Sequence, residues 1–218
     1  MRNKVLNITN GDYFNDYFLS KNGGEAVPFR EVMMDGEADL DIYSDEFIML
    51  RSVELHVSIE EYKAKTLLNK SLISNYSTLC LWFGRDTFCQ MNLLMLLAYL
   101  ERIEYGGEVF LNLIDDETFD VIEKGIVVEL GIYQKIYCEV LMLKIMPKEY
   151  GVISKGAIEL YFDYHSNGGA LARIVRENRD KTDKELLCLL LENSKEYGLS
   201  DIQAEKLIRK YRKGENND

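Results

Sequence analysis

Ser77 to Glu104 reads STLCLWFGRDTFCQMNLLMLLAYLERIE and joins two apolar segments through a short polar turn. Residues 79–83 are an unbroken apolar run that ends at Gly84, and Asp86 opens a segment that is apolar on most faces as far as Ile103. A strand with one face in water alternates apolar and polar residues, whereas a continuous run is typical of a strand covered on both faces in a parallel sheet. The stretch therefore predicts the central strand, tight turn and buried helix of an α/β domain.

A second buried strand is expected shortly after this helix. Residues 108–114 read EVFLNLI, with Gly106 and Gly107 before them and Asp115 and Asp116 after them. Strand, helix and strand in this order form a βαβ unit, whose crossover is right-handed in nearly all proteins. We therefore predict a Rossmann-like, mostly parallel sheet flanked by helices.

The N-terminal part of the chain repeats this pattern. Lys4 to Thr9 (KVLNIT) predicts a strand, and the aromatic residues that follow Asp12 share one face of a helix. Asn10 or Asp12 is expected to cap this helix, and Gly11 to permit the sharp turn before it. Ala26 to Phe29 is expected to form a second strand, confined to a sheet edge by its proline.

Beyond Asp116 the pattern becomes mainly helical. Residues 132–144 and 152–165 predict helices, whereas residues 126–130 fit either a short edge strand or part of a helix. Two capping boxes, Thr182 with Glu185 and Ser200 with Gln203, predict two further helices near the C-terminus. In the second of them Ile202, Leu207, Ile208 and Tyr211 are expected to face inward. We therefore expect a Rossmann-like domain over residues 1–116 and a mainly helical domain over residues 117–218 packed on it.

Composition limits the range of functions. The chain has 218 residues, is 47% hydrophobic and carries a formal net charge of -11, which disfavours general binding to nucleic-acid backbones or anionic membranes. Its four cysteines form no CxxC pair and are expected to be small buried residues of a reducing compartment. The longest apolar run, Leu93 to Leu100, is too short to cross a bilayer, and the N-terminus lacks a signal-type apolar run. We expect a cytoplasmic protein.

Residues 31–46 carry seven acidic side chains and no basic one. Calcium loops of the D-x-[DN]-x-[DN]-G type have their glycine in the sixth position, whereas Gly36 directly follows Asp35. We therefore expect a solvated acidic loop and predict no metal site. His56 and His165 have no patterned His, Cys or carboxylate partners and receive no assigned role.

Several short motifs occur in order along the first half: Ile8-Thr9-Asn10-Gly11-Asp12, Pro28-Phe29-Arg30-Glu31, Arg51, and Leu81-Trp82-Phe83 followed by Asp86, Phe88, Gln90 and Leu93. Together they resemble the bacterial family catalogued as domain of unknown function eighteen thirty-five, over about residues 1 to 115. The resemblance implies no particular activity or ligand. The acidic stretch after Glu31 departs from the family pattern, and the C-terminal half is similar only in its Tyr197-Gly198-Leu199-Ser200 turn.

The polar motif residues follow the expected strands at their carboxyl ends, where open α/β sheets bind ligands. If the first and central strands are neighbours, these residues share one crevice. The candidate ligand-binding residues are Asn10, Gly11, Asp12, Arg30, Glu31, Arg51, Arg85, Asp86 and Gln90. The alternative interpretation is a structural network that ties loops to helix ends.

The chemistry of such a crevice stays open at this point. Asp12, Glu31 and Asp86 have the groups for acid–base chemistry or for holding a cation, and Arg30 or Arg51 for binding a phosphate or carboxylate. No dinucleotide, P-loop, nucleophile-elbow or zinc-protease motif occurs, so no reaction and no cofactor is predicted.

Three functions remain. The first is binding of a small polar or nucleotide-like ligand at the strand ends, with or without catalysis. The second is a non-enzymatic interaction module that docks a partner or a second copy through an exposed apolar patch on the C-terminal helices. The third is a helix-turn-helix over residues 185–211, which the acidic net charge disfavours.

Overall fold

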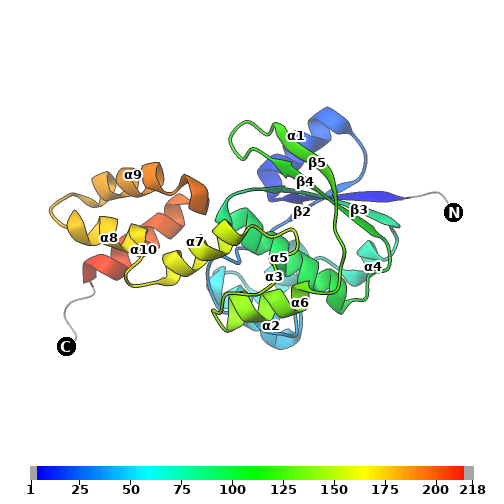
Figure 1. Ribbon diagram of the computed structural model, residues 1–218, viewed down its shortest axis with the longest axis horizontal. Coiled ribbons are helices and arrows are strands. Elements are labelled where there is room, and N and C mark those ends of the chain that lie inside the picture. Colours follow the sequence, from blue (N-terminus) through cyan, green and yellow to red (C-terminus); the bar gives the residue numbers. More distant parts are fainter. Residues whose placement is uncertain (1–3, 214–218) are drawn as a thin grey trace.

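The computed structural model describes residues 4–213 and confirms the α/β prediction. Five strands form one sheet in the order β2-β1-β3-β4-β5 (Figure 1). β1, β2, β3 and β4 are parallel, and β5 runs antiparallel to β4. Their bounds are β1 Val5–Asn10, β2 Ala26–Phe29, β3 Thr78–Gly84, β4 Glu108–Ile114 and β5 Val121–Val127.

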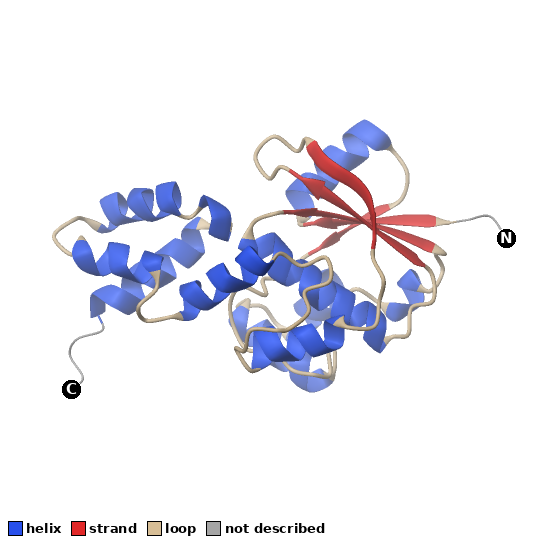
Figure 2. Cartoon of the chain, in the orientation of Figure 1, coloured by secondary structure: helices blue, strands red, loops and turns tan. Residues whose placement is uncertain are grey.

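Helices cover both faces of this sheet (Figures 1 and 2). α1 lies on one face, where Phe14 and Phe18 pack with Trp82 and Ile114 in a small apolar cluster. α2 to α6 lie on the other face and enclose the main core. The bounds of these six helices are α1 Asp12–Asn22, α2 Asp45–Glu54, α3 Ile59–Lys65, α4 Lys70–Ile73, α5 Thr87–Arg102 and α6 Tyr133–Tyr137.

β3 and α5 are the centre of the fold, as their apolar patterns predict. Every residue of α5 from Cys89 to Leu100 is buried. Asp86 caps the helix, because its Oδ1 accepts a hydrogen bond from the backbone N–H of Cys89 at 2.7 Å. The turn between strand and helix is therefore fixed by the same residue that stands at the carboxyl end of the sheet.

The strand order places a topological switch point between β1 and β3. From β1 the chain crosses to β2 on one side, and from β3 it crosses to β4 on the other side. Crevices at such points, outside the carboxyl ends of the strands, are the usual ligand sites of open α/β sheets. The first and central strands are neighbours, which is the condition set for a shared crevice.

The sheet extends beyond residue 116. β5 is an edge strand that ends at Val127, so the alternative left open for residues 126–130 resolves mainly to a strand end and a loop. The predicted helix over residues 132–144 is α6 continued by a π-helical turn, Cys138–Met142. The division into two domains stays a prediction, and residues 214–218 of its second part lie outside the described chain.

The remaining helices form a lobe that α7 connects to the sheet half (Figure 1). α7 begins at Lys155 behind the cap Ser154, three residues later than predicted. Both predicted capping boxes are present, at Thr182 and at Ser200. The bounds are α7 Lys155–His165, α8 Ala170–Glu177, α9 Asp183–Asn193, the 3-10 turn η2 Lys195–Tyr197 and α10 Asp201–Lys213.

Three local predictions were wrong. The N-cap of α1 is Gly11, with no side-chain cap, so neither Asn10 nor Asp12 caps this helix. Ile202, expected to face inward, is 69% exposed. Cys188 is exposed rather than buried, although all four cysteines are free as expected.

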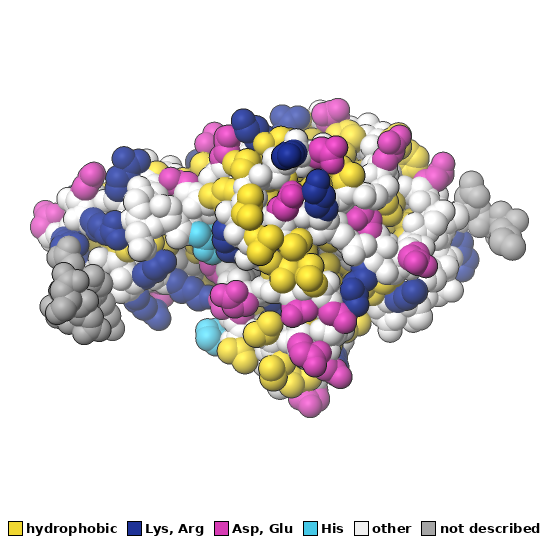
Figure 3. Space-filling view, turned by 60° about the horizontal axis from the view of Figure 1, so that its bottom comes forward, with side chains coloured by type: hydrophobic (Ala, Val, Ile, Leu, Met, Phe, Trp, Pro, Cys, Tyr) yellow, Lys and Arg dark blue, Asp and Glu magenta, His cyan; other side chains and the backbone are white. Residues whose placement is uncertain are grey.

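The surface of the lobe is mainly polar and charged. Figure 3 shows hydrophobic side chains gathered on the sheet half and few of them on the lobe at the left. In the described part of α7 to α10, Ile202 is the one large hydrophobic side chain that is exposed. Within the described residues, no helix combines the length and apolar character needed to cross a lipid bilayer.

Candidate functional site

Asn10 stands at the switch point and is tied to the start of α5. Its Nδ2 donates to Cys89 Sγ at 2.8 Å, and its Oδ1 accepts from Asn92 Nδ2 at 3.0 Å. Asn92 also donates to the backbone carbonyl of Glu31 at 2.6 Å and accepts from the backbone N–H of Met33. These bonds satisfy the polar groups between β1 and β3, so Asn10 joins loop to helix.

Asp12 and Arg30 pair with each other at the end of β1 and β2. Arg30 Nε donates to both carboxylate oxygens of Asp12, at 2.8 and 2.9 Å, and its Nη1 donates to the carbonyl of Lys65. Both side chains are partly exposed, that of Arg30 at 37% and that of Asp12 at 63%. The pair clamps the loop after β2 to α1 and α3, away from Asp86.

Glu31 and Arg51 form an ion pair at 3.1 Å in the interior, where both side chains are fully buried. Arg51 also donates to the carbonyls of Val32 and Asp35, and Tyr62 donates its hydroxyl hydrogen to Glu31. Glu31 is thus not part of a solvated loop as predicted, because an arginine from α2 neutralises it inside the fold. The pair holds residues 31–37 against α2.

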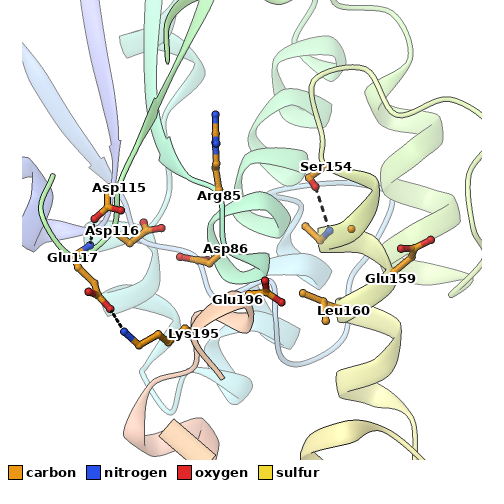
Figure 4. A pocket seen from close by; sticks show the side chains of 12 residues that line it. Arg85, Asp86, Asp115, Asp116, Glu117, Ser154, Glu159, Leu160, Lys195 and Glu196 are labelled. Atoms are coloured by element: carbon orange, nitrogen blue, oxygen red, sulfur yellow. Dashed lines mark hydrogen bonds and ion pairs between the residues drawn. The ribbon is translucent and has the colours of Figure 1, made fainter. Parts of the chain in front are cut away.

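A cavity of about 570 Å³ lies at the carboxyl ends of β3 and β4, next to the switch point. Four segments form its walls: the β3–α5 turn, the loop after β4, the first turns of α7, and η2 of the lobe (Figure 4). Its lining residues are Arg85, Asp86, Asp115, Asp116, Glu117, Ser154, Gly156, Ala157, Glu159, Leu160, Lys195 and Glu196.

Of the nine residues predicted from the sequence, Arg85 and Asp86 line this cavity. Gln90 lies behind it, buried, where its amide nitrogen donates to the carbonyl of Gly84 at 2.9 Å and its amide oxygen accepts from the N–H of Ser154 at 3.0 Å. Gln90 thereby positions the start of α7 over the strand end. The other six, Asn10, Gly11, Asp12, Arg30, Glu31 and Arg51, lie outside the lining.

Asp86, Cys89 and Asp116 converge at the inner end of the cavity. Their potential ligand atoms lie within 4.8 Å of one another, and the Cys89 thiol donates to Asp116 Oδ1 at 3.3 Å. Figure 4 shows the carboxylates of Asp86 and Asp116 directed toward each other, while Arg85 extends away. Gly84 and Gly198 leave the space for this arrangement, because a Cβ at either position would overlap one of the carboxylates.

The negative charge of this cluster changes its protonation. Partial desolvation, together with the neighbouring charge of Asp86, raises the pKa of Asp116 to about 7. Burial raises the pKa of the Cys89 thiol well above its usual value, and Asp86 and Asp116 raise it further. Near neutral pH the thiol is therefore protonated, and Asp116 is present in both its protonated and its charged form.

The cavity as a whole is acidic, with six carboxylates and two basic groups in its lining. Both basic groups already have acidic partners: Lys195 lies 2.8 Å from Glu117, and Arg85 lies 3.9 Å from Glu123. Among the described residues, no basic nitrogen lies within ion-pair distance of Asp86 or Asp116. The inner end of the cavity is therefore negative and uncompensated.

Sequence reasoning missed Asp116, Cys89 and the whole wall from the C-terminal half. For Asp116 a signal existed, because Asp115 and Asp116 directly follow a predicted strand, as Asp86 nearly does. For residues 154–160 and 195–196 no local pattern indicates that they cover the sheet end. Comparisons with protein-family models, with curated proteins and with solved structures return no match.

Proposed function

We propose that this protein binds a small polar molecule in the cavity at the carboxyl ends of β3 and β4. The observation that carries the proposal is the cavity itself, whose volume of about 570 Å³ falls within the range of small-molecule sites. It lies where parallel α/β sheets bind their ligands, beside the switch point. The family resemblance adds no ligand to this proposal.

The walls are held in place before any ligand arrives. Asp86 is fixed as the cap of α5, and Thr87 Oγ1 donates to the carbonyl of Glu196 at 3.1 Å. Tyr197 donates its hydroxyl hydrogen to Asp163 at 2.6 Å, which joins η2 to α7. A preformed site loses little conformational entropy on binding, and such preorganisation favours affinity.

The interaction alternative has less support. It predicted an apolar patch on the C-terminal helices. On the described part of α7 to α10 only Ile202 is a large exposed hydrophobic side chain, and the exposed Leu143, Ile145 and Met146 lie in the segment before α7. The helix-turn-helix alternative places the N-terminal turn of its second helix in the major groove, between the DNA phosphates. The first turns of α9 and α10 instead carry Asp183, Glu185 and Asp201, which repel phosphates.

A variant that fills the cavity tests the proposal. Gly156 lines the cavity, and a Cβ there would meet only Ser154 Oγ, at 3.7 Å. The Cβ of Gly156→Phe therefore fits without overlap, and its ring is expected to occupy the cavity. The matched control is Gly168→Phe, an exposed glycine outside the lining whose Cβ meets only Ser166 Oγ, at 3.8 Å. Amines, amino acids, polyols, sugar phosphates, nucleotides and divalent salts are screened by thermal shift.

We expect at least one class of compound to raise the melting temperature of the wild type and of Gly168→Phe by several degrees, and Gly156→Phe to lose the effect. A compound at about 100 times its dissociation constant stabilises by about 2.7 kcal/mol, which suffices for such a shift. A screen without response, or a response that Gly156→Phe keeps in full, contradicts the proposal.

A further inference from the structure

The charge of the cavity indicates which class of small molecule it accepts. Three of its six carboxylates are already compensated or bonded within the protein: Glu117 pairs with Lys195, Glu159 lies 3.4 Å from Lys155, and Asp115 accepts from the loop that follows it. Among the described residues, no cation pairs with Asp86, Asp116 or Glu196, and the first two of these lie next to each other. Two adjacent carboxylates without a paired cation favour a ligand that brings positive charge.

The hydrogen-bonding state of the cluster leaves acceptors for a donor ligand. Asp86 uses Oδ1 for the N–H of Cys89, and Asp116 uses Oδ1 for the Cys89 thiol. The two carboxyl groups also share a hydrogen bond while Asp116 is protonated, and among the described residues no further group donates to the Oδ2 atom of either. An ammonium group has three donors and no acceptor, so it matches two carboxylate oxygens that face one space.

The size and lining of the cavity favour an organic cation over a bare metal ion. An ion occupies a small part of about 570 Å³, and the third donor of the cluster is a thiol that burial and two carboxylates keep protonated. Leu160 and Ala157 give the opposite wall an apolar surface, and Figure 4 shows the Leu160 side chain directed into the cavity. That surface suits methylene groups.

From these observations we infer that the ligand is a small aliphatic amine, whose ammonium group lies between Asp86 and Asp116 and whose carbon chain lies along Leu160. The inference rests on the proposed function and names its ligand class. Phosphate-bearing molecules, including nucleotides without a bound cation, are excluded by repulsion from the same carboxylates. The proposed ligand class thus narrows from small polar molecules in general to small organic cations.

Isothermal titration calorimetry with 1,4-diaminobutane tests the inference, and 1,4-butanediol serves as the neutral analogue with the same carbon chain. Asp86→Asn keeps an oxygen that caps α5, so it removes charge without removing the cap. Asp116→Asn removes the second charge. Asp16→Asn is the matched control, since Asp16 is an exposed acid of α1 outside the cavity.

We expect the diamine to bind the wild type at pH 8 and the diol not to bind. Each cavity variant is expected to weaken diamine binding roughly tenfold or more, the loss of one hydrogen bond to a charged group, and Asp16→Asn to leave it within about twofold. Added NaCl is expected to weaken binding through screening.

Other outcomes separate the two proposals. Equal binding of diol and diamine, binding of ATP or a sugar phosphate that Gly156→Phe blocks, or a response to Mg²⁺ or Mn²⁺ without any response to amines would each overturn the amine class and leave a ligand site in the cavity. Absence of binding by these probes and by the whole screened panel would overturn both.

Discussion

Gly198, in the turn after η2, lies directly against the carboxylate of Asp86 at the end of the central strand. Gly198 has a left-handed backbone with φ of 67°, and a Cβ there would overlap that carboxylate. The lobe thus contacts the site through a position that only glycine fills without strain.

Gly198→Ala is accordingly expected to lower the free energy of unfolding by about 1–3 kcal/mol, because the backbone strain and the overlap add. Urea denaturation measures the change. Gly106→Ala is the control, since a Cβ at that position meets no atom within 4 Å. Equal stability of the two variants would contradict the described contact.

Asp86 is expected to contribute to stability as a cap and not through its charge. Asp86→Ala removes the bond to the Cys89 N–H and is expected to cost about 1 kcal/mol, whereas Asp86→Asn keeps an acceptor and is expected to cost a few tenths. Chemical denaturation of both variants distinguishes these values. If Asn destabilises as much as Ala, the cap is not the source of the effect.

The buried pair of Glu31 and Arg51 is expected to be the most sensitive polar contact in the fold. Arg51→Met leaves Glu31 buried without a cation, and we expect a loss of about 3–5 kcal/mol in the free energy of unfolding. The control is Arg30→Met, which breaks the exposed pair with Asp12 and is expected to cost at most about 1 kcal/mol. Similar losses in the two variants would show that burial does not decide the cost.

Asp116 is expected to make the protein less stable as pH rises from about 4 to about 7. Its pKa in the fold, about 7, exceeds the usual value of 3.8, so the folded state holds a proton that the unfolded state has lost in this range. Above pH 7 the cost is constant. The charged and titratable groups around it are Asp86 and Cys89 of α5, Asp115 and Glu117 of its own loop, and Lys195 and Glu196 of η2.

Asp116→Asn removes this dependence. We expect the wild type to lose about 1 kcal/mol more of its free energy of unfolding between pH 5 and pH 8 than the variant does. The value is well below a full conversion of the pKa shift, because Asp116 is exposed as a residue and solvent screens its charge. Denaturation curves at the two pH values test it, and parallel pH profiles of wild type and variant would contradict it.

His165 is expected to produce the opposite slope at lower pH. Burial, with the nearby charge of Lys144, lowers its pKa to about 4 from the usual 6.5. The neutral ring is therefore favoured in the fold, and its contribution is lost as pH falls from about 6.5 to about 4. We expect the free energy of unfolding of His165→Gln to fall by roughly 2 kcal/mol less than that of the wild type between pH 6.5 and pH 4. Unfolding measured from pH 7 to pH 4 tests this, with an unchanged slope as the contrary result.

Much of the fold follows from local pattern. The apolar run of residues 79–83, the helix that follows Asp86 and the two capping boxes each depend on neighbours in sequence, and the structure has all of them. The site follows less well. Seven of the nine predicted residues do not line the cavity. Several of them have partners that are distant in sequence, such as Arg51 of α2 for Glu31, and no periodicity encodes those long-range pairs.

Asp116 shows the limit from the other side. The rule that led to Asp86, a polar residue at the carboxyl end of a predicted strand, applies equally to Asp115 and Asp116. The rule does not say which pair of strand ends borders the cavity. In the structure the cavity lies at the ends of β3 and β4, and not at those of β1 and β3. That choice depends on where α7 and η2 pack, which is a property of the assembled tertiary structure.

The walls of the cavity come from segments far apart in the chain, so binding there and docking of the lobe form one thermodynamic cycle. Any molecule that contacts both Asp116 and the η2 segment must favour the docked lobe by the same factor by which docking favours its binding. A change that loosens the docking of the lobe, such as breaking the pair of Lys195 and Glu117, then lowers the affinity even for a ligand that contacts neither of these residues. Affinity at the end of the sheet is in this way a measure of cohesion between the two halves of the molecule.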